Sequence, residues 1–213
     1  MEKKRMKLWK KILLVILVVF ILFSIYVIRN FIIISNIVNT SKEYATKTNY
    51  IASVYSIHTD GVSIVKSYHK DGKYLSLIQT KVNDVNDNAK LTVYKSDNEG
   101  IGVIEADNKK IAILNNNIVG GIHVITFENI ANMNIIQQLL FSAITRVYTD
   151  ECNNKDCYYM EIYKGWKVWI NKENGTIVRE INGGSVAERT YEFDVVKDED
   201  ITKPDISDCE IQK

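Results

Sequence analysis

Hydrophobic and polar positions follow three different patterns along this chain. An uncharged apolar run extends from Ile12 to Ile28. At about 1.5 Å per residue, this run is at the short end of what crosses a hydrocarbon core of about 30 Å. Apolar residues then recur at helical spacing between residues 31 and 48, and from Tyr50 onward the period changes to two. The pattern therefore predicts a membrane-spanning helix that continues as the first helix of a strand-rich domain.

Most of the remaining chain predicts an antiparallel sheet. Runs with period two are separated by turn residues such as Asp71-Gly72, and Asp-Gly is a strong hairpin signal because both turn positions tolerate positive φ. The predicted strands cover residues 50–58, 62–70, 73–81, 91–95, 102–106, 110–115, 146–152, 157–163, 166–171, 176–181 and 187–195.

A second helix interrupts these strands. It is predicted over residues 132–146, and its apolar positions fall on one face. The segment before it is irregular but unusually apolar, so that Ile118–Phe127 is a candidate flap. An α+β domain is expected, with one helix inserted between strands of an antiparallel sheet. The apolar positions of the inserted helix are Ile136, Leu140, Ala143, Ile144 and Val147.

Charge around the apolar run predicts its orientation. Six basic residues precede the run and favour a cytoplasmic N-terminus. No small-x-small cleavage site follows it, so an uncleaved signal anchor is the preferred interpretation and cleavage at another site the alternative. The expected organisation is a cytoplasmic basic tail at 1–11, a transmembrane signal anchor at 12–34 and an extracytoplasmic domain at 35–213. The basic residues are Lys3, Lys4, Arg5, Lys7, Lys10 and Lys11.

The formal net charge of +1 averages these two compartments. Without the seven basic residues up to Arg29 and without Glu2, 20 basic and 25 acidic residues remain, a net charge of −5. A mildly acidic domain argues against binding nucleic acid or clinging to anionic lipid headgroups.

The sequence contains no recognisable catalytic or cofactor motif. His58, His69 and His123 are scattered and lie outside any nucleophile, zinc-protease, P-loop or dinucleotide pattern. The acidic residues at 198–208 lack the spacing of a calcium loop, so a solvated acidic end is the better interpretation. We therefore expect that the protein is not an enzyme and that it binds neither a metal ion nor a cofactor.

Two of the three cysteines flank a predicted hairpin turn. Cys152 and Cys157 are separated by four polar residues, which would bring the sulfurs close together. The outer side of a membrane permits oxidation, so a disulfide is possible, although it would close a very short loop and gain little entropy. Buried free thiols are the alternative. Zinc binding has only weak support from the spacing, and Cys209 lies in the tail.

The order of elements and several phrases resemble the lipoprotein-carrier (LolA-like) superfamily. The phrases are Lys167–Gly175, an aromatic strand followed by a polar turn, and Tyr191-Glu192-Phe193 near the end. Lys155–Tyr159 and Pro204-Asp205 are similar to membrane-anchored members in Gram-positive bacteria. The resemblance implies an antiparallel, strongly curved half-barrel sheet whose concave face is covered by helices and can bind acyl chains. It carries over no binding residue.

Two functions fit these expectations. The first is a membrane-tethered binding module for a lipid-like or lipoprotein ligand, with an apolar sheet face as its pocket. The second is a structural or regulatory module with a filled core, which docks a partner in the cell envelope. Core and cavity require the same side chains, so the sequence leaves both open. The candidate pocket residues are Leu75, Leu77, Val168, Ile170, Tyr191 and Phe193.

Overall fold

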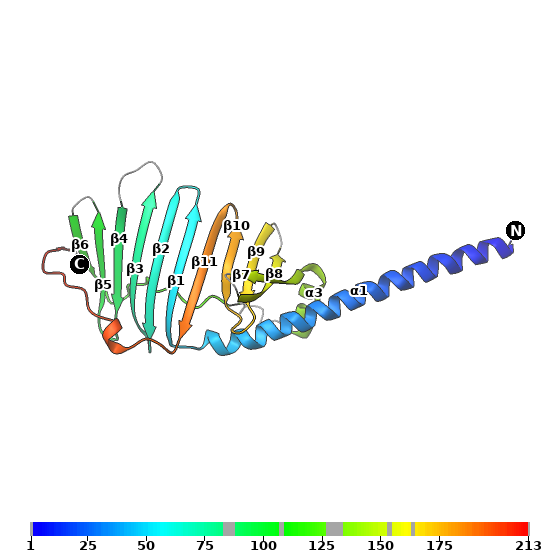
Figure 1. Cartoon of the computed structure of the whole chain (residues 1–213), viewed down its shortest axis with the longest axis horizontal. Helices are drawn as coiled ribbons and strands as arrows, with labels where there is room; N and C mark the ends of the chain where they lie inside the picture. Colours follow the sequence, from blue (N-terminus) through cyan, green and yellow to red (C-terminus); the bar gives the residue numbers. More distant parts are fainter. Residues whose placement is uncertain are drawn as a thin grey trace.

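A computed structural model shows one open, mixed and mostly antiparallel sheet with a long N-terminal helix beside it (Figure 1). The structure describes residues 2–82, 88–106, 109–126, 134–152, 155–162 and 165–212. The twelve strands are ordered β12-β6-β5-β4-β3-β2-β1-β11-β10-β9-β8-β7. Their bounds are β1 Asn49–His58, β2 Gly61–Lys70, β3 Lys73–Val82, β4 Asn88–Lys95, β5 Gly100–Ala106, β6 Lys109–Leu114, β7 Arg146–Cys152, β8 Lys155–Ile162, β9 Trp166–Asn171, β10 Ile177–Asn182, β11 Ser185–Phe193 and β12 Glu210–Gln212.

The predicted α+β class is confirmed, and the strands begin and end within a few residues of their expected positions. Asp71 and Gly72 both have positive φ, 50° and 83°, as the tight turn between β2 and β3 requires. The strand β12, which pairs with β6 in the parallel sense, was not predicted from the sequence. The sheet remains open, in agreement with the half-barrel architecture that the LolA-like resemblance implies.

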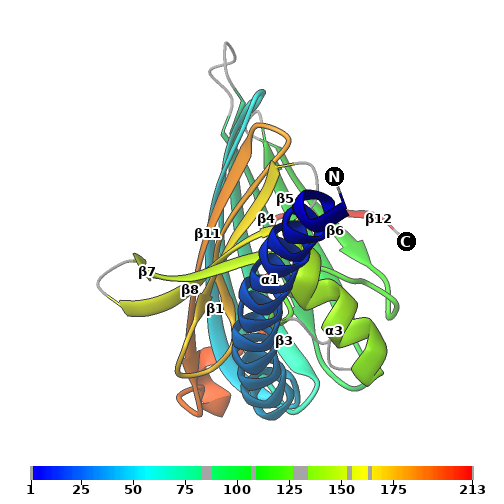
Figure 2. The ribbon, with the colours of Figure 1, turned by 90° about the vertical axis from the view of Figure 1, so that its right-hand side faces the viewer.

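A single helix, α1 (Glu2–Ala45), contains both the apolar run and the first helix of the domain. Its N-terminal half projects away from the sheet, whereas its C-terminal part lies along it (Figures 1 and 2). The stretch Leu8–Ala45 is long and apolar enough to be a candidate membrane span.

Contacts between α1 and the domain begin before residue 35. The Tyr26 hydroxyl donates to the Thr145 carbonyl at 2.9 Å. The Asn30 side-chain amide is fully buried and donates to the carbonyls of Ser142 and Thr145 at 3.1 and 2.9 Å. The expected boundary at residues 34 and 35 stays a prediction for the membrane limit, but residues from Tyr26 onward already contribute to the packed structure.

The main core lies between α1 and the strands at one end of the sheet. We call this side of the sheet the helix face and the other side the outer face. On β9, Val168 and Ile170 have no exposed surface and pack against α1. The buried cluster comprises Ile34, Ile37, Val38, Val147, Met160, Val168, Ile170 and Ile177.

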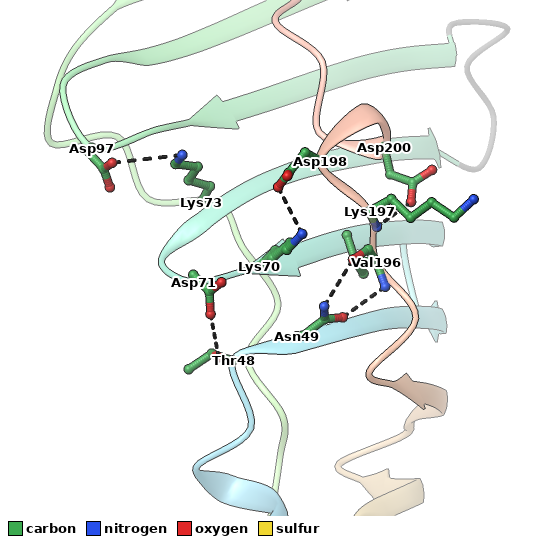
Figure 3. A network of polar contacts seen from close by, with 10 residues as sticks. All are labelled: Thr48, Asn49, Lys70, Asp71, Lys73, Asp97, Val196, Lys197, Asp198 and Asp200. Atoms are coloured by element: carbon green, nitrogen blue, oxygen red, sulfur yellow. Dashed lines mark hydrogen bonds and ion pairs between the residues drawn. The ribbon is translucent and has the colours of Figure 1, made fainter.

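The C-terminal segment covers part of the outer face. Asn49 holds it in place through two hydrogen bonds with the backbone of Val196, at 2.9 and 3.0 Å, and Lys70 pairs with Asp198 at 3.0 Å (Figure 3). Farther along, Ile206 and Cys209 pack on a second cluster of Ile101, Val103 and Ala112. The acidic end is therefore not simply a solvated tail. The sequence analysis considered the acidic residues of this segment and overlooked the apolar residues that pack it on the sheet.

Candidate functional site

The six predicted pocket residues do not share one face. Strand registry places Tyr191 opposite Ala52 and Phe193 opposite Tyr50, on the helix face with Val168 and Ile170. Leu75 instead aligns with Tyr68, and Leu77 with Lys66, on the outer face. Leu75 and Leu77 share a face with each other, as predicted, but not with the other four candidate residues. Alternation shows that residues within one strand share a face, but it does not show which face of the sheet they share.

The helix-face members of the set are covered by the protein itself. Val168 and Ile170 belong to the main core. The Phe193 ring makes an edge contact with Tyr44 of α1, with the ring centroids 4.8 Å apart. The Tyr191 hydroxyl accepts a hydrogen bond from the Ile125 amide at 3.2 Å. These contacts favour core packing over an acyl-chain cavity at these positions.

The candidate flap lies along the helix face between the sheet strands and solvent. Within its described part, up to Thr126, the Tyr74 hydroxyl donates to the Ile118 carbonyl at 2.9 Å and accepts from the Gly120 amide at 3.0 Å. A Cβ atom at Gly121 would come within 2.6 Å of the His69 ring, so this close approach depends on glycine. Phe127 lies outside the described residues. The segment is thus packed down on β2 and β3.

Beside this segment is an open recess of about 390 Å³. His69 is one of its lining residues, stacked on Tyr50 with ring centroids 4.5 Å apart, and its Nε2 is 3.0 Å from the Ser67 hydroxyl. Burial and, to a smaller extent, His123 lower the pKa of His69 to about 4. Lys47 and Lys95 also line the recess, so its wall is polar and cationic as well as aromatic.

Stability should therefore fall in acid because of His69. The pKa of His69 in the folded protein, about 4, lies below the ordinary histidine value of 6.5, so the unfolded chain binds a proton first as pH falls. The His69 contribution is fully present above pH 6.5 and is lost between there and about pH 4. The loss is at most about 3 kcal/mol.

Chemical denaturation of the full chain in detergent at pH 7 and pH 4.5 measures this loss. His69→Gln should reduce the pH dependence of the free energy of unfolding. Equal pH dependence in wild type and His69→Gln would contradict the assignment.

The outer face carries a second open groove, of about 410 Å³, which the prediction missed. Its apolar floor includes Tyr55 and Ile64, which are 42% and 49% exposed. Ile57 and Leu77 on the same face are 43% and 41% exposed. We call this the outer groove, lined by Tyr55, Val62, Ile64, Gln79, Thr80, Lys81 and Lys90.

Cationic side chains border the outer groove. Lys66 is adjacent to Leu77 across β2 and β3, whereas Lys81 and Lys90 belong to the groove wall. Among the residues that the structure describes, none of these three amines lies within ion-pair distance of a carboxylate. Glu105 is aligned with Lys90 across the sheet. The sequence alone did not predict the outer groove. Its apolar residues and lysines come from different strands, and only the strand registry brings them together.

The side chains of the two hairpin cysteines are buried and interact with each other. Burial, and to a smaller extent Cys152, raises the pKa of Cys157 to about 12, which disfavours the reactive thiolate. Asn153 and Asn154 of the connecting turn lie outside the described residues. The disulfide stays a prediction.

Thiol counting with Ellman's reagent at pH 8 separates the alternatives. Native protein should react slowly or only at Cys209, which is half-buried, because the other two thiols are buried. If Cys152 and Cys157 are free thiols, denatured and unreduced protein shows all three thiols. A single thiol after denaturation would instead demonstrate the Cys152–Cys157 disulfide.

The described part of the chain offers little support for a metal site or for a catalytic nucleophile. No group of three His, Cys, Asp or Glu residues there lies close enough to hold a metal ion. Ser67 does contact His69, but both are buried, and Ser67 also bonds to Ser76.

Comparisons with known proteins add a weak structural likeness. No model of a protein family matches the sequence, and no curated protein does. Three solved structures are similar at 8% sequence identity: MucB (TM-score 0.40), MucB in complex with MucA(peri) (0.42) and the Pseudomonas aeruginosa MucA/MucB complex (0.40). They cover 83%, 84% and 84% of this chain. In turn, this chain spans 64%, 61% and 63% of theirs.

Proposed function

We propose that the chain is a membrane-tethered, extracytoplasmic protein-interaction module. In this proposal α1 anchors the domain as a single span with its N-terminus inside, and the outer groove docks a segment of another envelope protein. The observation that carries the choice is the packing of the helix face. Val168 and Ile170 are completely buried there, which favours a filled core over a lipid-carrying pocket.

The groove indicates the chemistry of its partner. Its exposed floor suits apolar side chains, and the surrounding lysines suit carboxylates. This local positive charge stands out on a domain whose net charge after Arg29 is −5. The proposed occupant is therefore a segment of an envelope protein that combines apolar and acidic residues.

Binding without catalysis completes the proposal. The Ser67–His69 pair is buried beneath the segment that contains Ile122, whose amide lies 3.4 Å from the Ser67 oxygen. A lipid or lipoprotein ligand remains the competing proposal and would have to occupy space outside the main core.

Site-specific photo-crosslinking in the native membrane tests the docking proposal. A photoreactive residue at Ile64 of the full chain should give one discrete adduct with an extracytoplasmic segment rich in apolar and acidic residues. Charge reversal by Lys81→Glu and Lys90→Glu should abolish this adduct. A probe at Tyr148 serves as the matched control, because Tyr148 is about as exposed as Ile64 but lies near the edge of the same face, away from the outer groove.

The opposite result is equally clear. Absence of an adduct at Ile64, together with near-stoichiometric lipid in native mass spectra of the full chain, would overturn the interaction proposal and favour the carrier. An adduct that persists after charge reversal would contradict the proposed partner chemistry.

A further inference from the structure

Helix α3 (Ile135–Ile144) has an inverted distribution of apolar side chains. A helix on a soluble domain normally turns its apolar stripe toward the core. Here the side facing the protein contributes Ser142, which is fully buried, and Phe141, which is half-buried. Five large aliphatic residues instead face outward and are 40–80% exposed: Ile135, Ile136, Leu139, Leu140 and Ile144.

The position of α3 gives this exposed stripe a neighbour. The helix packs beside α1 at the end of the domain from which the apolar run projects (Figures 1 and 2). Asn30 of α1 bonds to the carbonyls of Ser142 and Thr145, and Tyr26 bonds to Thr145. Tyr26 and Asn30 flank Ile28, the last residue of the uncharged run. A bilayer around that run would therefore meet α3.

The remaining chemistry of α3 suits an apolar environment. The helix contains no charged residue. At its N-terminus, Asn134 and Gln137 form a reciprocal capping box, with both hydrogen bonds at 2.9 Å. The box provides hydrogen-bond acceptors for two backbone amides, which would find no acceptor in hydrocarbon. Beyond its C-terminus, the side chain of Arg146 is exposed, and Arg29 of α1 bonds to the Val147 carbonyl. Such cations suit the headgroup region.

We infer that α3 lies in the outer leaflet of the membrane and inserts its aliphatic stripe beside the α1 span. This inference rests on the tethering part of the proposed function. The bilayer is the occupant because anchoring by α1 places it next to α3 without any further partner. The domain then contacts the membrane at two points, the span and an interfacial helix.

Depth-dependent fluorescence quenching of the full chain in vesicles tests the inference. Leu140→Cys, in a Cys209→Ser background that leaves the buried cysteines unlabelled, carries an NBD group. The vesicles contain phosphatidylethanolamine, phosphatidylglycerol and phosphatidylcholine with a doxyl quencher in its acyl chain. Leu17→Cys, within the span and 51% exposed, is the positive control, and Leu77→Cys, on the outer face and 41% exposed, is the negative control.

Quenching at positions 17 and 140 but not at 77 is the expected result, with most of the emission lost at 140. Quenching at 17 alone would overturn the α3 inference while leaving the anchor intact, and would point to a protein cover on the stripe if the 140 emission were blue-shifted. No quenching at 17 would show that the tethering proposal itself fails, and the α3 inference with it.

Discussion

Truncating Ile34 to alanine should lower the free energy of unfolding by about 2–5 kcal/mol. Ile34 is 1% exposed and belongs to the main core between α1 and the sheet. Its truncation removes apolar contacts and leaves a cavity that the surrounding strands can only partly fill. The result would show that α1 is a component of the folded domain.

Ile32→Ala provides a matched control for this experiment. Ile32 is on the same helix, two residues away, but is 54% exposed, so in detergent its truncation should change stability by no more than about 0.5 kcal/mol. Denaturation of the full chain in micelles can be followed through the fluorescence of Trp166 and Trp169 on β9. Equal effects of the two substitutions would contradict the packing of α1 described here.

Glu180→Gln should destabilise the domain by about 3–5 kcal/mol, because it leaves the charge of Arg189 buried without its partner. The Arg189 side chain is 9% exposed, and its guanidinium lies 2.7 Å from the Glu180 carboxylate. Glu180 also accepts a hydrogen bond from the Trp166 indole at 2.8 Å. The substitution therefore breaks a small network on the helix face.

The other face of the same two strands offers the control. Arg179 and Glu188 are 3.6 Å apart, and their side chains are 39% and 41% exposed. Glu188→Gln should cost less than about 1 kcal/mol, since solvent screens an exposed pair. Thermal unfolding of both variants in the same detergent measures the difference. A cost at Glu188 as large as that at Glu180 would show that burial does not govern these pairs.

Local patterns in the sequence were sufficient for most of the secondary structure. The period-two runs and the Asp71-Gly72 turn identified β2 and β3 because hairpin registry depends on neighbouring residues. The strand β12 escaped detection because it is three residues long and pairs with β6, about a hundred positions away in the chain.

Faces were harder to predict than elements. Ile136, Leu140 and Ile144 lie on α3 as predicted, but their side chains are exposed. Val147, which was predicted to share their face, instead lies in β7 and is buried in the main core. Leu77 was grouped with Val168 and Phe193 as an apolar-face candidate, but its pairing with Lys66 and Thr92 places it on the other face of the sheet. Periodicity measures whether residues point the same way, whereas the direction itself depends on tertiary packing.

The helix α1 has a mechanical consequence. It continues without interruption from Glu2 to Ala45, and neither glycine nor proline occurs within it. A helix of this composition behaves as a stiff rod, because sharp kinks require a local break in the hydrogen-bond ladder. The part of α1 from Tyr26 onward is packed on the domain. In the proposed membrane-anchored arrangement, tilting or turning the rod would therefore swing the whole domain. The far edge of the sheet, at β6 and β12, would sweep through the widest arc.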